Sequence, residues 1–320
     1  MSTIYQIIEK LFLNKKKSIY LVFSVIASFI LAQPEDITWA RDRINYMNYA
    51  EFSQLILERN FSNGILTLLT NEPLFLLINM FMSLLFSPEN VVRLIIFLSS
   101  LGVLCALGKI SKYNIWVLFF FFFLPQIVKN HIIHLRQGLG LCIYLLGLAS
   151  NKKILKYSSM FIHSSFIFLL LFEVLEKLFK RMKFSLSLRL LFSSVLLTCF
   201  VLIVPKLALI FGDRRATLYN FTIGHNASGL GFLIWLFVGI LYIIVIKKDN
   251  VSIISSYGLI FYLISYFLLD FGARIFENII PLILVVALSD HRKDVRSLFA
   301  IFFLLYGLIQ WYSSGLSFLI

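Results

Sequence analysis

The stretch VVRLIIFLSSLGVLCALGKI, residues 91–110, decides the fold class. Its only charged residues are Arg93 and Lys109, one close to each end. An α-helix rises about 1.5 Å per residue, so about 20 apolar residues are needed to cross the roughly 30 Å hydrocarbon core of a bilayer. This segment has that length and that composition, and it therefore predicts a transmembrane helix.

Similar apolar runs recur along the whole chain. We expect spans near residues 18–33, 73–87, 91–110, 114–128, 132–150, 155–172, 186–204, 230–247, 251–269, 275–288 and 297–313. Several are short for a bilayer, so some are expected to be tilted, broken or re-entrant. Pro125, Pro205 and Pro281 are expected kinks or ends. The sequence predicts one all-α domain over residues 1–320, a polytopic integral membrane helical bundle with about ten or eleven transmembrane helices.

The composition supports the same conclusion. Of 320 residues, 60% are hydrophobic and 14% are charged, and the mean hydropathy is +0.90. A soluble domain has about a quarter of charged residues, and a soluble protein of this size cannot hide so much apolar surface. The net charge of +13 comes from basic clusters between the apolar runs. The positive-inside rule and anionic lipids select such clusters, so nucleic acid is not expected as a partner.

The basic clusters also predict an orientation. With the N-terminus inside, residues 34–72 and 205–229 form two loops on the outer face. Part of the first loop is an amphipathic stretch that is expected to lie along the membrane interface. The same count places Lys109 and Lys112, and also Lys152, Lys153 and Lys156, outside, against the rule. The sidedness of the spans between about residues 73 and 172 therefore stays open, because a broken or re-entrant element there would change it.

Ionisable residues within or beside a span are costly to insert into a membrane, so they are the first candidates for function. They are Glu72, Arg93, Lys129, His131, His134, Arg136, His163, Asp270, Arg274 and Glu277. For each of these residues, a purely structural role is an alternative to a functional one. Arg93 and Lys129 are expected to reach the headgroups, whereas Asp270, Arg274 and Glu277 have the spacing either of a structural ion pair or of a ligand site.

The histidines do not predict a metal site. His131 and His134 are one helical turn apart, but zinc needs further ligands and none is evident nearby. They serve equally well as hydrogen-bonded packing residues or, together with His163, as proton carriers in a transporter. The chain has no glycine-rich phosphate loop and no nucleophile elbow. We therefore expect neither a metal nor a cofactor.

Arginines point to a different ligand. A guanidinium stays charged near a membrane and can hold phosphate through two parallel hydrogen bonds. Arg136, Arg215 and Arg274 lie in or near spans, and Arg214 adjoins the second of them. Such a set suits a lipid that carries a pyrophosphate.

The order of the motifs resembles the EpsG family of bacterial polysaccharide polymerases, the Wzy-like proteins of O-antigen, capsule and exopolysaccharide synthesis. The matching pieces extend from about residue 36 to 288: Asp42-Arg-Ile-Asn-Tyr46-Met-Asn-Tyr49, Asn71-Glu-Pro-Leu-Phe75, Leu135-Arg-Gln-Gly-Leu139, Ile162-His-Ser-Ser165, Arg215-Ala-Thr-Leu-Tyr219 and Arg274-Ile-Phe-Glu-Asn-Ile-Ile-Pro281. Each piece is weak alone, and their shared order carries the resemblance.

The resemblance implies a metal- and nucleotide-independent enzyme of the glycosyltransferase type in the bacterial inner membrane. Such proteins join oligosaccharide repeat units on undecaprenyl pyrophosphate at the outer face, and undecaprenyl pyrophosphate is the leaving group. Their partners are these lipid-linked glycans, membrane lipids, a chain-length regulator and a flippase. The leaving group is already activated, so the protein has to position two substrates and stabilise the departing charge.

Roles follow from this reaction as expectations. The pyrophosphate-binding residues are expected to be Arg136, Gln137, Arg214, Arg215 and Arg274. The general base is expected among His163, Glu72 and Asp42, in that order. Tyr46 and Tyr219 are candidates for sugar stacking, and Tyr49 is expected to anchor the chain at the interface.

The sequence is also compatible with two alternative functions. A flippase for the same lipid-linked glycans, or a proton-coupled permease, is expected to have internal repeats and charges at the membrane midplane. We find no convincing repeat, and most charges lie toward one face. A membrane acyltransferase that modifies surface sugars is expected to have a paired histidine and acid early in the chain, where this sequence has Asp42, Arg43 and Tyr46 instead.

Overall fold

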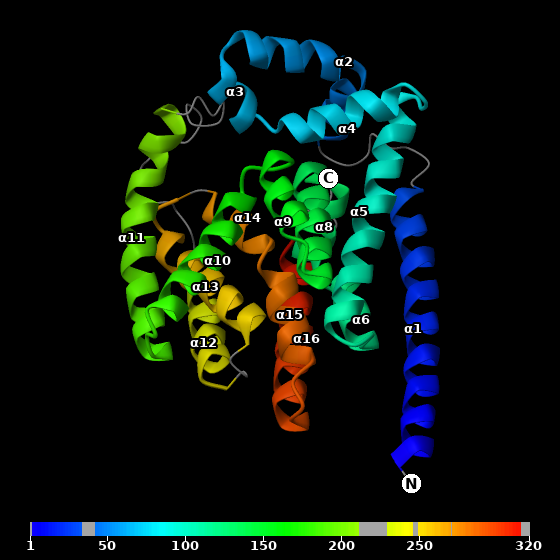
Figure 1. The fold of residues 1–320 in the computed structure, drawn as a ribbon, viewed down its shortest axis with the longest axis vertical. Helices are drawn as coiled ribbons and strands as arrows, with labels where there is room; N and C mark the ends of the chain where they lie inside the picture. The colour runs from blue at the N-terminus through cyan, green and yellow to red at the C-terminus, as the bar shows by residue number, and fades with distance from the viewer. Residues whose placement is uncertain (1, 34–41, 211–228, 246–248, 270, 315–320) are drawn as a thin grey trace.

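The computed structural model describes residues 2–33, 42–210, 229–245, 249–269 and 271–314. Throughout these ranges the regular structure is helical (Figure 1). The helices are α1 Ser2–Ala32, α2 Arg43–Ser62, α3 Ile65–Thr70, α4 Pro73–Ser83, α5 Pro88–Ile110, α6 Ile115–Phe123, α7 Pro125–Ile132, α8 Leu135–Ser150, α9 Lys153–Ser158, the 3₁₀ turn η2 Ser159–Phe161, α10 Phe166–Arg181, α11 Leu186–Ile210, α12 Leu230–Val245, α13 Asn250–Ser265, α14 Gly272–Glu277, α15 Ile280–Leu288 and α16 Lys293–Ser314. The prediction of an all-α membrane bundle is confirmed.

Three of the described helices are long and apolar enough to cross a membrane. They lie in α5, α11 and α16. The pair α6 and α7 passes the same test together but bends by 73° at Leu124 and Pro125, which is the broken span expected at that proline. Of the shorter apolar helices, α8 and α13 are largely buried within the bundle. The chain is thus a multi-pass membrane protein.

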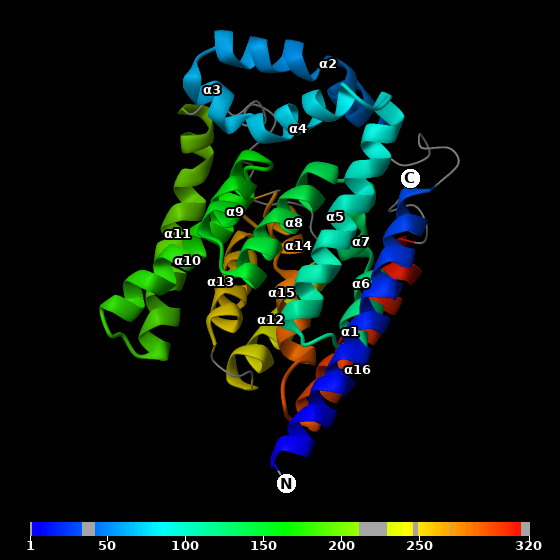
Figure 2. The same ribbon diagram turned by 45° about the vertical axis from the view of Figure 1, so that its right-hand side comes forward.

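Helices α2, α3 and α4 form a cap across one end of the bundle, as Figures 1 and 2 show. We therefore correct the expected span at 73–87, because α4 ends at Ser83 and belongs to the cap. Proline explains the start of this helix: Pro73 is its first residue, where a missing N–H costs nothing. The cap is tied to itself, since the Ser83 hydroxyl donates to the Ala50 carbonyl oxygen at 2.7 Å.

With α4 in the cap, α1 and α5 become antiparallel neighbours. The Tyr20 hydroxyl donates to the Leu104 carbonyl oxygen at 3.2 Å. The helices approach closely because Gly108 has no side chain, and a Cβ there would lie 2.6 Å from the Tyr20 ring. Lys109 and Lys112 consequently lie at the same end of the bundle as the start of α1, opposite the cap (Figure 2). The conflict with the positive-inside rule at these two lysines disappears.

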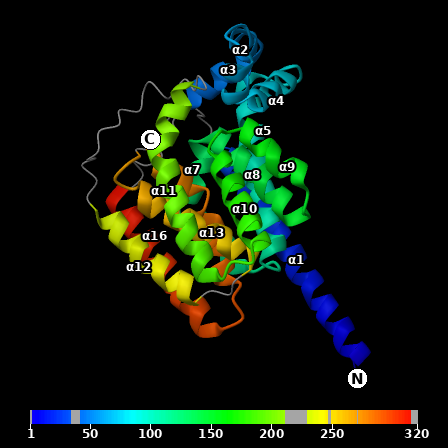
Figure 3. The same ribbon diagram turned by 60° about the vertical axis from the view of Figure 1, so that its left-hand side comes forward.

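The outward faces of the bundle are apolar. Phe29 and Ile30 of α1, Leu191 of α11 and Ile301 of α16 are all exposed in the isolated chain. In water this would be an aggregation surface, whereas in a bilayer it is the surface that contacts lipid. Figure 3 shows α11, α12 and α16 on the side opposite α1.

A buried charge network, not expected from the sequence, fixes α8, α9 and α10 together. Lys156 donates to Glu173, and the Tyr144 hydroxyl donates to the same carboxylate at 3.0 Å. One turn later, Glu176 accepts from Arg189 at 2.7 Å and from Tyr257 at 2.9 Å. Each carboxylate is matched by a cation, which is the condition for burying charge in a low-dielectric interior.

This network gives a stability prediction. Lys156→Met should lower the free energy of unfolding by about 3 kcal/mol, because it leaves the buried Glu173 carboxylate with only the more exposed Lys177 ammonium, 3.6 Å away, as a cation. The double variant Lys156→Met/Glu173→Gln should recover much of the loss, since the neutral amide keeps the bond from Tyr144. Thermal unfolding of both purified variants measures the difference. Equal melting temperatures for the single and the double variant would contradict the assignment.

Candidate functional site

Glu72 is the central residue at the junction between cap and bundle. It lies between α3 and α4, and its φ of 61° places a non-glycine residue in the left-handed region. That conformation costs on the order of 1–3 kcal/mol and persists only where the surroundings hold it. Its side chain is buried, with 3% of the residue exposed. The strained backbone aims a carboxylate from the cap into the bundle.

Arg136 meets this carboxylate from the other side. The chain breaks between α7 and α8 at His134, and Arg136 is the second residue of α8. Its NH1 nitrogen donates to Glu72 Oε2. The break packs closely, because a Cβ on Gly138 would lie 2.2 Å from the Asn130 carbonyl oxygen. The short helix start therefore delivers a guanidinium to the cap.

Two tyrosines of α2 cover the guanidinium. Its Cζ lies 5.2 Å from the centre of the Tyr49 ring and 5.9 Å from that of Tyr46, within the range of cation–π attraction. Phe75 packs edge-on against both rings. Burial raises the pKa of Tyr46 against the opposing effect of the Arg136 charge, so its hydroxyl stays protonated. The prediction that Tyr49 serves as an interface anchor is not tested, but its ring lies against Arg136.

His163 approaches Glu72 from the turn before α10. Its Nε2 lies 3.8 Å from Glu72 Oε1. On its other side, Nδ1 accepts from the Ser165 backbone N–H at 3.2 Å and lies 2.7 Å from the Ser165 hydroxyl. The Asn278 amide donates to that hydroxyl oxygen at 3.1 Å, which leaves the hydroxyl proton for Nδ1. In the neutral ring the proton is therefore on Nε2, facing Glu72.

A second contact joins α8 to α14. Gln137 is buried, and its Nε2 donates to the Arg274 backbone carbonyl at 2.6 Å. The Arg274 side chain is exposed. The same short helix ends with Glu277, whose Oε1 lies 3.3 Å from the Lys129 ammonium. Through the bond from Gln137, α14 contacts the start of α8, the helix that carries Arg136.

The sequence model of the EpsG family matches residues 19–316. The chain belongs to the EpsG family. Membership is in line with a general role as a polysaccharide polymerase of the glycosyltransferase type. No curated protein and no solved structure matches the chain.

Within this EpsG protein, the predicted site residues are brought together in part. Glu72, Arg136, His163 and Tyr46 converge from four separate elements, and Gln137 adjoins them. Asp42 lies at the start of α2, is exposed, and accepts from the Asn45 amide at 3.3 Å. Arg214, Arg215 and Tyr219, like Asp270, lie outside the described residues.

One expectation about charges is corrected, and the expectation that Arg93 reaches the headgroups stays a prediction. Lys129 was expected to reach the headgroups, but its ammonium pairs with Glu277 inside the bundle. Arg93 donates to Glu89 and to the Ala32 carbonyl oxygen, which ties α5 to the end of α1. The residues of the Lys129–Glu277 pair are 148 positions apart, so no local sequence pattern could predict this pairing.

His131 packs within the bundle, His291 is exposed, and His225 lies outside the described residues. His131 is buried, and its Nδ1 lies 3.0 Å from the Ser99 hydroxyl. In the described part of the chain, no three His, Cys, Asp or Glu residues are placed to hold a metal ion. Ser165 and Asn278, which orient His163, were not singled out in the sequence. Ser165 belongs to the Ile162–Ser165 motif and Asn278 to the Arg274–Pro281 motif, and this was the available signal.

Proposed function

We propose that this chain joins lipid-linked oligosaccharide repeat units, with undecaprenyl pyrophosphate as the leaving group, on the outer face of the bacterial inner membrane. The observation that carries the proposal is the convergence of Arg136, Glu72 and His163 under the cap, with tyrosines beside them. A cation for a diphosphate, an acid–base pair for a hydroxyl and aromatic rings for sugars are the groups that this reaction needs.

The proposed reaction assigns each atom. A hydroxyl of the incoming unit attacks the anomeric carbon of the growing chain, a new C–O bond forms, and the bond to the pyrophosphate oxygen breaks. The hydroxyl proton passes to Glu72, and the lipid pyrophosphate departs as an anion beside Arg136. We place the base at Glu72 rather than His163, because Nδ1 of His163 already accepts hydrogen bonds and Nε2 carries a proton. His163 then steadies the carboxylate.

The remaining pyrophosphate ligands are proposed on the same side. α11 reaches the cap end of the bundle at Ile210 (Figure 1). This supports our proposal that Arg214 and Arg215, which follow it, act beside Arg136. Arg274 lies on α14, whose backbone contacts Gln137. Lipid-linked glycans are the proposed substrates, and a flippase and a chain-length regulator are proposed partners.

The orientation can be tested by labelling. Ser62→Cys in the cap and Lys112→Cys at the opposite end are both exposed positions. In a background where Cys105, Cys142 and Cys199 are replaced by serine, a membrane-impermeant maleimide should label Ser62→Cys in intact cells or spheroplasts. Lys112→Cys should react only after the membrane is opened. The reverse pattern would place the proposed site on the inner face and overturn its role in outer-face polymerisation.

The function itself is tested by reconstitution. Purified protein in liposomes with lipid-linked repeat units should yield a ladder of longer glycans, without nucleotide or added metal. In cells, deletion should remove long chains and leave single units at the surface. A flippase would behave differently, because its loss removes surface units of every length. Absence of a ladder from the liposomes, with translocation of the lipid-linked unit instead, would replace the proposal with the flippase.

A further inference from the structure

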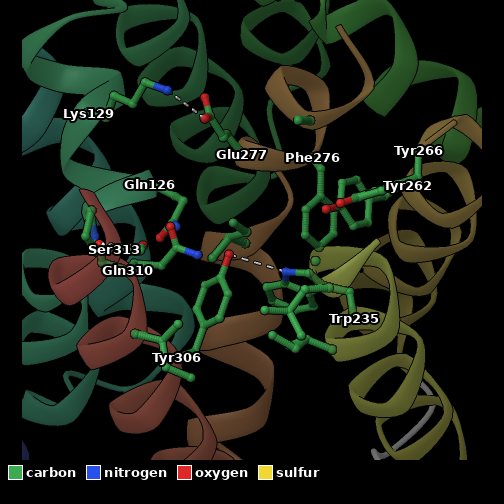
Figure 4. Close-up of a pocket in the computed structure, with 17 residues that line it drawn as sticks. Gln126, Lys129, Trp235, Tyr262, Tyr266, Phe276, Glu277, Tyr306, Gln310 and Ser313 are labelled. Carbon is green, nitrogen blue, oxygen red and sulfur yellow. Dashed lines mark hydrogen bonds and ion pairs between the residues drawn. The ribbon is translucent and has the colours of Figure 1, made fainter. Parts of the chain in front are cut away.

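A cavity lies beside α14, and Glu277 of that helix is one of its lining residues. Its volume is about 460 Å³, within the range of roughly 300–1,000 Å³ that is usual for small-molecule sites. Figure 4 shows side chains reaching toward it from α7, α12, α13, α14 and α16. The end of α16 and the start of α12 line it, so it lies toward the end of α16 farthest from Lys293. Nothing in the proposed reaction so far uses it.

The polar groups of this cavity point to a ligand with hydrogen-bond donors. Gln126 Oε1 and Glu277 Oε2 are both buried and have no hydrogen-bond partner. A buried acceptor that lacks a donor costs about 1–3 kcal/mol, so two around one cavity are unusual. An apolar lipid chain would leave both acceptors unsatisfied. A molecule with several hydroxyl groups would satisfy them after a rotation of each side chain, because both oxygens are shielded from the cavity in the conformation described.

The other walls are aromatic. The Tyr262 and Phe276 rings stack at 4.1 Å between centroids. Trp235 packs edge-on against Phe276, and its indole N–H donates to the Tyr306 hydroxyl at 3.4 Å. Aromatic faces beside precisely placed amide and carboxylate groups suit a pyranose ring, which has apolar C–H faces and polar edges.

Helix α14 connects this cavity to the junction site. Glu277 faces the cavity and holds Lys129, whereas the next residue, Asn278, donates to the Ser165 hydroxyl that contacts His163. A sugar bound beside Glu277 is therefore separated from His163 by one short hydrogen-bonded relay. A glycan several sugars long spans such a separation.

We propose that the cavity lined by Gln126, Glu277 and Trp235 binds a sugar of the oligosaccharide repeat unit. This rests on the proposed polymerase function and adds a glycan subsite to it. The Gln126 and Glu277 carboxamide and carboxylate oxygens accept from sugar hydroxyls, and the aromatic walls stack on the ring. The subsite holds the glycan while its reacting end lies beside the ion pair of Glu72 and Arg136.

Gln126→Leu is the sharpest test, because it removes an unsatisfied acceptor and keeps the side chain's size. A purely structural residue in that position would become more stable or stay unchanged on this replacement. The subsite predicts about tenfold weaker binding of glycan, with no loss of thermal stability. Gln54→Leu, on the exposed face of α2, is the matched control and should bind as the wild type does.

The probe is the repeat oligosaccharide released from the producing cell's lipid-linked units by mild acid. Isothermal titration of the full chain in nanodiscs measures its affinity, and inorganic pyrophosphate is titrated in parallel. We expect Gln126→Leu to weaken oligosaccharide binding and leave pyrophosphate binding unchanged. Equal oligosaccharide affinity in wild type and variant, or no binding to the wild type, overturns the subsite. Either result leaves the liposome ladder as a separate test of the polymerase function.

Discussion

Replacing Arg136 with alanine should abolish long glycan chains while leaving the protein inserted and single repeat units at the surface. The guanidinium is the one described cation that faces Glu72 directly, and it is the group proposed to neutralise the departing pyrophosphate. Loss of a charge-stabilising donor in an active site costs on the order of 100-fold or more in rate. Turnover of lipid-linked units in liposomes measures the loss.

Arg136→Lys separates charge from geometry. Lysine keeps the positive charge, but it has no planar fork and cannot bind two oxygens in parallel or stack on Tyr49 in the same way. We expect it to restore only a small part of the activity. Arg181→Ala, at the end of α10 away from the cap, is the control for loss of an exposed arginine and should polymerise normally. A full-length ladder from Arg136→Ala would remove Arg136 from the mechanism.

The sequence could predict the membrane class but not which apolar runs cross the bilayer. Residues 73–87 and 91–110 are both apolar, yet one run becomes α4 in the cap and the other becomes α5. Hydropathy measures transfer into an apolar environment, whether that environment is lipid or protein. A helix that packs on the end of a helical bundle can therefore be as apolar as one that crosses the bilayer. The exception to the positive-inside rule at Lys109 and Lys112 is the signal that one crossing too many is counted from hydropathy.

The site was predictable where motifs carry the reacting groups themselves. Glu72, Arg136 and His163 each belong to a different motif, and the family resemblance that these motifs carry implied a role for each of them. The supporting contacts were not predictable. The bonds from Asn278 to Ser165 and from Lys129 to Glu277 join residues more than 100 positions apart, and no local pattern encodes such a pairing.

Arg136 and Glu72 form an ion pair, and this has a consequence for the binding of a diphosphate at Arg136. A carboxylate against the guanidinium occupies part of the surface that a diphosphate would use. In the proposed reaction, the diphosphate of the substrate therefore competes with Glu72 for Arg136. We expect that, when the carboxylate takes up the hydroxyl proton, its hold on Arg136 weakens and the guanidinium is released to the leaving group as charge develops there. In this arrangement proton uptake and leaving-group stabilisation are one coupled event.

Glu72→Gln tests this coupling, because it keeps the side chain's shape and removes both its charge and its basicity. We expect kcat to fall by about 100- to 10,000-fold, the usual contribution of a general base. Pyrophosphate affinity should stay the same or rise, since Arg136 loses its competing carboxylate. Arg136→Ala is expected to weaken pyrophosphate binding. A measurement of pyrophosphate affinity therefore distinguishes the two variants.

The matched control is Glu58→Gln on α2, an exposed carboxylate that accepts from the Gln54 amide at 2.9 Å. It should leave both kcat and pyrophosphate affinity unchanged. Normal turnover by Glu72→Gln would show that another group takes the proton, and His163 would then be the first to examine. Weaker pyrophosphate binding by Glu72→Gln would instead make Glu72 a positioning residue for Arg136, since a carboxylate that only competes with the ligand cannot strengthen its binding.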